Sequence, residues 1–185
     1  MPIRARIRSE RGYSLVELLT VMITLGAILG GLTTAFVSAT NTEATSNARF
    51  RAEQTAQVGM SNLRNEVHCA SAINSGWTAS AITLTLPAGC PDGSASATTS
   101  MSWCTSLVST GRYALYRQSG SSCGTSGILE ADYLTSGNVF SYTCTASSGL
   151  RPVLTVSLPV DVDPLHAPLT YTLGQDLAFR NGGRC

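Results

Sequence analysis

The sequence is poor in charge and contains no lysine, so all 12 basic residues are arginines. Four of them, Arg4, Arg6, Arg8 and Arg11, precede a long apolar run, and the only acid among them is Glu10. The remaining 8 arginines face 10 acidic residues, which leaves that part with a net charge of about −2. The basic surface that a nucleic-acid-binding protein needs is therefore missing, and we expect no nucleic-acid partner.

Features typical of metal sites and enzymes are also scarce. No two cysteines have the C-x-x-C spacing of a zinc site. Of the two histidines, His68 falls near the end of a predicted helix, where capping of terminal carbonyls is expected, and His166 lies in a loop flanked by prolines. Asp161 and Asp163 are candidate calcium ligands in a loop, but two carboxylates alone are weak evidence, and solvated loop acids are the favoured interpretation. We predict no enzymatic activity, no metal and no other cofactor.

The cysteines favour disulfides. The candidates are Cys69, Cys90, Cys104, Cys123, Cys144 and Cys185. An even number of cysteines in a domain rich in serine and threonine is typical of an exported, oxidised protein. Fifteen pairings are possible for six cysteines, so the connectivity stays open. A local bridge between Cys90 and Cys104 across one loop is plausible.

The chain has one membrane-length apolar run. From Leu18 to Thr42 there are 25 residues without a charge. A helix over residues 13–37 is roughly 37 Å long, enough to cross a bilayer with some tilt and contact lipid. An ordinary cleaved secretory signal is shorter and is cut after its apolar part. We therefore expect a single-pass membrane protein, with its arginine-rich N-terminus in the cytoplasm and its C-terminal domain outside.

The helical pattern continues beyond the apolar run. Small or apolar residues recur at three- and four-residue spacing, at Ala44, Ala48, Ala52, Thr55, Ala56, Gly59, Leu63 and Val67. Most polar residues of this stretch, including Arg51, Gln54 and Glu66, are expected on other faces. No proline occurs between Pro2 and Pro87. These patterns predict one helix from about Ser14 to about Cys69, apolar all round first and amphipathic afterwards.

After Ala72 the apolar period changes to two. Strands are predicted around Ile82–Leu86, Tyr113–Arg117, Val139–Cys144, Leu154–Val160 and Leu169–Leu173. Loops rich in glycine and serine are predicted at residues 89–100 and 119–127. The predicted fold class is α+β, with the long N-terminal helix packed on one face of a C-terminal antiparallel sheet.

The residues around the start of the apolar run carry the most specific signal. Arg11 and Gly12 are followed by Tyr13, then by Ser-Leu-Val and Glu17, and the apolar run begins at Leu18. This segment resembles the processing signal of the type IV pilin and type II secretion pseudopilin superfamily. The resemblance implies cleavage between Gly12 and Tyr13 by a prepilin peptidase and N-methylation of Tyr13. It also implies that Glu17 pairs with the N-terminal amine of a neighbouring subunit during assembly.

Other parts of the chain carry weaker signals. Gly26, Gly30 and Gly31 have the spacing that lets membrane helices pack closely, although glycine is also common in such helices without that role. The order of motifs from Arg112 to a closing Leu177-Ala-Phe-Arg-Asn resembles the minor pilins of the PilW and J-pseudopilin group. The resemblance implies partners that are other pilin subunits and an inner-membrane platform protein with an assembly ATPase.

These observations divide the chain into four parts. Residues 1–12 form a cytoplasmic leader, 13–37 a transmembrane and filament-core helix, 38–70 its amphipathic continuation, and 71–185 a β-rich extracytoplasmic domain. The expected function is that of a minor pilin or pseudopilin that ends in a pilus or on the cell surface. A major pilin remains an alternative, and so does a signal-anchored extracytoplasmic binding protein that does not polymerise.

Overall fold

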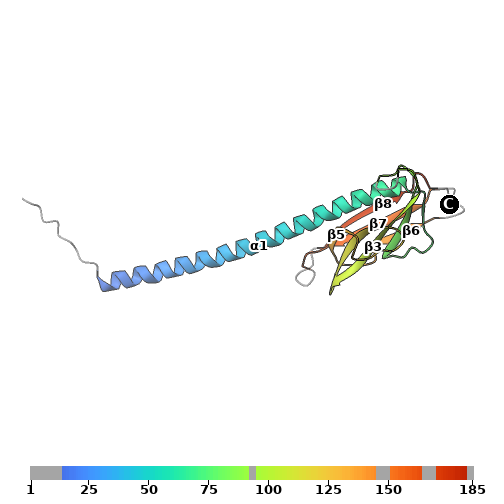
Figure 1. Cartoon of the computed structure of the whole chain (residues 1–185). Helices are drawn as coiled ribbons and strands as arrows, with labels where there is room; N and C mark the ends of the chain where they lie inside the picture. Colours follow the sequence, from blue (N-terminus) through green and yellow to red (C-terminus); the bar gives the residue numbers. More distant parts are fainter. Residues whose placement is uncertain (1–13, 92–94, 145–150, 164–169, 183–185) are drawn as a thin grey trace, which may run out of the picture. The chain divides into compact units, whose positions relative to one another are not determined.

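The structure, a computed structural model, describes residues 14–91, 95–144, 151–163 and 170–182. This part of the chain forms one helix followed by eight strands (Figure 1). The elements are α1 (Leu15–Cys69), β1 (Ala72–Ile73), β2 (Ala81–Leu86), β3 (Thr99–Ser109), β4 (Arg112–Ser119), β5 (Ile128–Leu134), β6 (Phe140–Thr143), β7 (Val153–Val160) and β8 (Tyr171–Ala178). The chain divides into two compact units, Met1–Thr45 and Ser46–Cys185, and each is described by itself.

The predicted single helix is confirmed. Helix α1 begins one residue after Ser14, whose carbonyl accepts a hydrogen bond from the Leu18 amide at 3.2 Å. It ends at Cys69, and the Ala70 amide still donates to the Glu66 carbonyl at 2.7 Å. The absence of proline from this stretch allows 55 residues to remain helical without interruption.

The strands form one antiparallel sheet in the order β1-β2-β3-β4-β5-β7-β6, with β8 pairing with β7. β5 meets β7 where Leu134 pairs with Val160. The amides of Val139 and Phe140 both donate to the Ala79 carbonyl, at 2.8 and 2.9 Å, beside the start of β2. The sheet therefore curls, because its β6 end approaches the strands at its other end.

The five predicted strands are confirmed as β2, β4, β6, β7 and β8, although Leu169 lies outside the described residues. Three strands were not predicted: β1, β3 and β5. Strand β3 reads Thr-Ser-Met-Ser-Trp-Cys-Thr-Ser-Leu-Val-Ser, and its many hydroxyl side chains hide the alternation. Strand β5 has register shifts against β4 between Tyr113 and Tyr116, so its side chains do not follow a strict period of two.

The core lies between the second half of α1 and the concave sheet, where the green part of the helix covers the strands (Figure 1). The helix contributes Ala52, Ala56, Met60, Leu63 and Val67 to this core. Alternate residues of β2 and β7 face it, and Trp103 of β3 is its largest fully buried side chain. The predicted helical stripe is thus confirmed at Ala52, Ala56, Gly59, Leu63 and Val67, whereas Ala44 and Thr55 are exposed.

Gly59 is the point of closest approach between helix and sheet. A Cβ atom added there would lie 2.7 Å from the Glu130 carbonyl oxygen in β5, nearer than real Cβ atoms come to other atoms. The small residues of the helical stripe therefore let the sheet approach the helix closely. At Gly59 the approach is so close that no side chain fits.

Two disulfides are fully described, and they correct the proposed Cys90–Cys104 bridge. Cys69 bonds Cys90, which ties the last residue of α1 to the loop after β2, and Cys104 bonds Cys123, which ties the loop after β4 to β3. Cys104 lies within β3, opposite Ala81 of β2 and Tyr116 of β4, whereas Cys90 packs beside the end of the helix. Cys144 is also disulfide-bonded, and Cys185 lies outside the described residues.

The close approach at Gly59 predicts that Gly59→Ala lowers the free energy of unfolding by about 1–3 kcal/mol, because overpacking against the backbone of β5 outweighs the better helix propensity of alanine. Denaturant unfolding with the disulfides intact measures this change. Gln57→Ala, at an exposed position of the same helix, is the matched control and should change the free energy by less than about 0.5 kcal/mol. Equal effects of the two substitutions would contradict the close contact.

Candidate functional site

The first half of α1 is an apolar surface that is not buried within the described chain. All residues from Ser14 to Asn47 are exposed, including every large apolar side chain from Leu15 to Val37. The helix is long and apolar enough to cross a membrane. Together with the disulfides, this is typical of a membrane-anchored protein whose folded domain lies outside the cytoplasm.

Threonine is the main polar residue of this segment, and its hydroxyls are satisfied within the helix. The Thr20 hydroxyl donates to the Glu17 carbonyl at 2.9 Å, and that of Thr24 donates to the Thr20 carbonyl at 3.0 Å. Thr33 and Thr34 bond back to Leu29 and Gly31 in the same way. The segment therefore presents few unsatisfied polar atoms to an apolar environment.

Glu17 is the one charged side chain between Leu15 and Val37. It lies in the first turn of α1, where the positive end of the helix dipole stabilises a carboxylate. Its side chain is exposed and has no ion-pair or hydrogen-bond partner within the described residues. The predicted processing residues Gly12 and Tyr13 lie outside those residues.

The predicted packing glycines lie on open surface. A Cβ atom added at Gly26, Gly30 or Gly31 would meet no atom within 4 Å. Gly26 and Gly30 are four residues apart and share one helix face, so a second helix can approach closely there.

The outward face of α1 in the second unit is unusual for a helix exposed to water. Along this face Asn47, Phe50, Gln54, Val58 and Ser61 follow one another at helical spacing, all exposed and none charged. Phe50 and Val58 are 66% and 55% exposed. A solvated helix normally carries charge on this face, so the composition favours contact with another surface.

A groove borders this face, between α1 and β5. Two adjoining hollows of about 240 and 310 Å³ share Thr55 and Leu129. Together they follow α1 from Ala48 to Val58, and we call them the α1/β5 groove. Leu129 is 52% exposed, so the wall of the groove is apolar.

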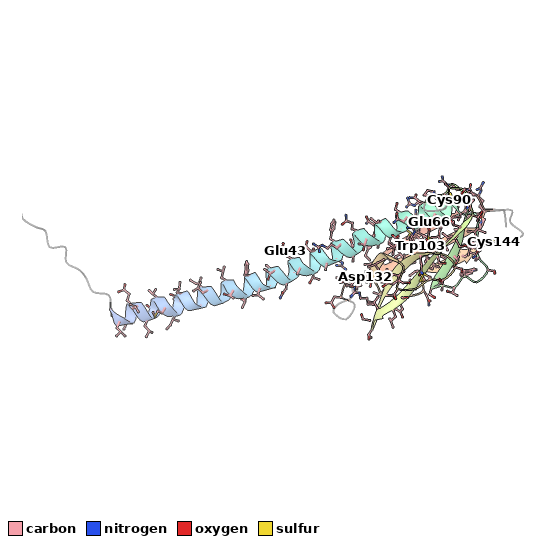
Figure 2. All side chains as sticks on the ribbon, viewed as in Figure 1. Glu43, Glu66, Cys90, Trp103, Asp132 and Cys144 are labelled. Atoms are coloured by element: carbon pink, nitrogen blue, oxygen red, sulfur yellow. A yellow bond between two sulfur atoms is a disulfide. The ribbon has the colours of Figure 1, made fainter. Side chains whose placement is uncertain are left out.

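A buried polar cluster lies under the helix, and the sequence analysis missed it. Glu66 was expected on a polar face, but it is only 1% exposed. Its carboxylate accepts a hydrogen bond from Trp103 Nε1 at 2.6 Å and forms an ion pair with Arg117 Nε at 2.6 Å. In Figure 2, Glu66 and Trp103 lie close together between the helix and the sheet.

Arg117 links this cluster to β5. Its Nη1 lies 3.9 Å from Glu130 Oε1, and Asn62 Nδ2 donates to Glu130 Oε2 at 2.9 Å. One buried arginine thus lies between two carboxylates, one from α1 and one from β5. This arrangement holds the helix on the sheet through satisfied charges.

A second cluster lies where β4 and β5 border the α1/β5 groove. The Arg112 guanidinium binds the Asp132 carboxylate through two nitrogens, with Nε 3.0 Å from Oδ1, and lies 3.9 Å from the centre of the Tyr133 ring. The Asp132 carboxylate raises the pKa of Arg112 above its usual value. Tyr133 has a φ of 60°, a strained value for a tyrosine. Its backbone amide donates a hydrogen bond to Asp132 Oδ1 at 2.6 Å.

The end of α1 is fixed by the segment that follows β8. Asn181 Nδ2 donates to the Cys69 carbonyl at 3.0 Å. Burial lowers the pKa of the neighbouring His68, and the positive charges of Arg180 and Arg64 lower it further. These effects outweigh the helix dipole, which favours a cation at this end.

The remaining chemical candidates do not form a site in the described chain. Asp161 is buried, and its carboxylate accepts a hydrogen bond from the Asp163 amide at 3.0 Å. His166 lies outside the described residues. No group of three metal-ligating side chains occurs among the residues that the structure describes.

Gly120–Gly124 has the G-x-S-x-G spacing of a nucleophile elbow, which the sequence analysis overlooked. It is a loop leading to β5 with Cys123 held in a disulfide, not the strand–turn–helix of a hydrolase.

Comparison of the chain with models of known protein families, with curated proteins and with solved structures gave no match.

The Glu66 cluster predicts that Glu66→Ala lowers the free energy of unfolding by about 3–5 kcal/mol, because it leaves Arg117 and the Trp103 N–H buried without this partner. Glu53→Ala is the control, since Glu53 forms a half-exposed pair with Arg49 at 3.7 Å and its loss costs less than about 1 kcal/mol. Denaturant unfolding compares the two variants. A Glu66→Ala effect no larger than that of Glu53→Ala would show that the buried pair does not hold the helix.

The lowered pKa of His68 predicts a pH effect. Because the unfolded chain, with a histidine pKa near 6.5, binds the proton more tightly than the folded chain, stability falls as the pH drops from 6.5 through the folded-state pKa. His68→Gln should lose this component, so its stability decreases less between pH 7.5 and pH 5 than that of the unmodified chain. Urea midpoints at the two pH values measure it. Parallel pH profiles for the two chains would rule it out.

Proposed function

We propose that this chain is a minor type IV pilin or a pseudopilin. A prepilin peptidase would cut it between Gly12 and Tyr13 and methylate Tyr13. The mature chain would then leave the membrane and enter a pilus or pseudopilus, driven by a platform protein and its ATPase. The filament would serve adhesion, motility, DNA uptake or protein secretion.

The observation that carries this proposal is the continuity of α1 from the apolar segment into the core of the domain. A simple membrane anchor needs only a flexible connection to its domain. Here no break or proline separates the apolar segment from the stripe that packs on the sheet. Such a continuous helix suits a subunit whose apolar segment and domain enter a filament as parts of one chain.

Two surface features support polymerisation over a solitary anchored domain. The apolar segment carries a single carboxylate at its start, and placing that charge in a membrane or a filament core is costly without a partner. The outward face of α1 in the second unit is uncharged and exposes Phe50 and Val58. Both features suit a chain that exchanges lipid and water contacts for contacts with other subunits.

The proposal predicts that Gly12→Leu blocks processing, because a bulky side chain prevents close approach of the scissile backbone to a peptidase. The variant should keep its 12-residue leader, remain in the membrane fraction and be missing from sheared filaments. Immunoblots of both fractions, with the unmodified chain alongside, measure this. Gly26→Leu, on the open face of α1, leaves the cleavage position intact and is the control for processing. Normal processing and assembly of Gly12→Leu would contradict the proposal.

A further inference from the structure

The α1/β5 groove contains one arginine whose charge is not used within the described chain. The guanidinium of Arg51 is exposed and lines the groove, and it has no hydrogen-bond or ion-pair partner among the described residues. Two other arginines near the helix and sheet are engaged: Arg64 donates to Gln175 and Arg112 binds Asp132.

The groove lining includes two acidic residues, Glu130 and Asp132, and both have partners other than Arg51. Glu130 accepts a hydrogen bond from Asn62 and lies near Arg117, and Asp132 is held by Arg112. The groove therefore has apolar walls and one available positive charge. A matching occupant is apolar, narrow and carries one negative charge.

The first half of α1 has these properties. Glu17 shares a helix face with Val21 and Ile28, at spacings of four and eleven residues, and all three are exposed. Glu17 has no partner among the described residues either. When two parallel helices place Glu17 level with Arg51, Val21 lies about 6 Å further along, and Val58 lies about 10 Å along α1 from Arg51, so Val21 falls within the groove.

We propose that the α1/β5 groove binds the N-terminal helical segment of a second copy of this chain, with Glu17 of that copy paired to Arg51. Small side chains at Ala48, Ala52 and Thr55 let the incoming helix come close to α1. Val21 contacts the apolar wall around Leu129 and Val58, and Ile28 lies just beyond the Val58 end of the groove. A carboxylate has two oxygens, so Glu17 can bind Arg51 and still accept a hydrogen bond from another donor.

This inference rests on the proposed function, since it names the partner of the exposed helix in the polymer. It assigns Arg51 a role in the register between subunits, because a charge pair in apolar surroundings fixes the relative position of two helices. Arg51 lies on the flank of the uncharged outward face, where its charge is available to the groove.

Photo-crosslinking of the full chain in intact cells, which hold both membrane-bound and assembled copies, tests the proposal. A benzophenone amino acid replaces Leu129 in one tagged copy, and mass spectrometry identifies crosslinked peptides from a second copy with a different tag. We expect crosslinks to residues 15–30 of the second copy. The same probe at Leu107, an exposed aliphatic position outside the groove lining, should give none. Crosslinks from Leu129 to another protein, or to other parts of the second copy, would overturn the proposal.

A charge-neutralisation cycle then tests the pair itself. Arg51→Gln and Glu17→Gln should each lower the crosslink yield about tenfold, in the range of close charge pairs at interfaces. In the double variant Arg51→Gln should cause no further loss, because its partner is already gone. An Arg51→Gln effect that is absent, or equally large with and without Glu17, would overturn the pairing. Arg64→Gln is the matched control and should leave the yield unchanged.

Sheared filaments from the same strains separate this inference from the proposed function. Filaments that contain the chain but give no Leu129 crosslink would refute the groove and leave the pilin proposal standing. Crosslinks from Leu129 without filaments would support the contact between copies and refute polymerisation.

Discussion

The buried pair between Glu66 and Arg117 is the interaction on which the domain depends. It places a charged residue of α1 between the helix and the sheet. The buried charge is stable there because Trp103 and Arg117 satisfy the carboxylate. It also fixes the rotation of the helix, since Glu66 reaches these partners only when the face with Gly59 and Leu63 points inward. The same rotation turns Phe50 and Val58 outward and places Arg51 at the α1/β5 groove. The surfaces that we assign to assembly therefore follow from this internal contact.

One helix has to suit two environments, and its composition changes accordingly. The first half exposes large apolar side chains, and its threonine hydroxyls donate hydrogen bonds to carbonyls of the same helix. The second half uses small residues on its inner face, because β5 approaches closely at Gly59. The change occurs without a proline or a break, so the domain and the apolar segment are parts of one element.

The helix and the fold class could be predicted from sequence because both depend on local periodicity. Strand β3 was missed since its hydroxyl side chains resemble a loop, and β5 was missed since its register shifts disturb the alternation. Glu66 lies three residues after Leu63, so the helical period did place it near the buried face. It was assigned to a polar face because a buried acid needs a partner, and Arg117 lies 51 residues away in the sequence. Disulfide pairing failed for a similar reason, since the partners depend on how strands and helix meet.

The central claim is that this chain becomes a filament subunit, and the mass of the chain in sheared filaments tests it most directly. Intact-mass spectrometry of the unmodified protein from that fraction should give residues 13–185 with one added methyl group. Detection of the chain only in membranes, with the mass of residues 1–185, would contradict the account.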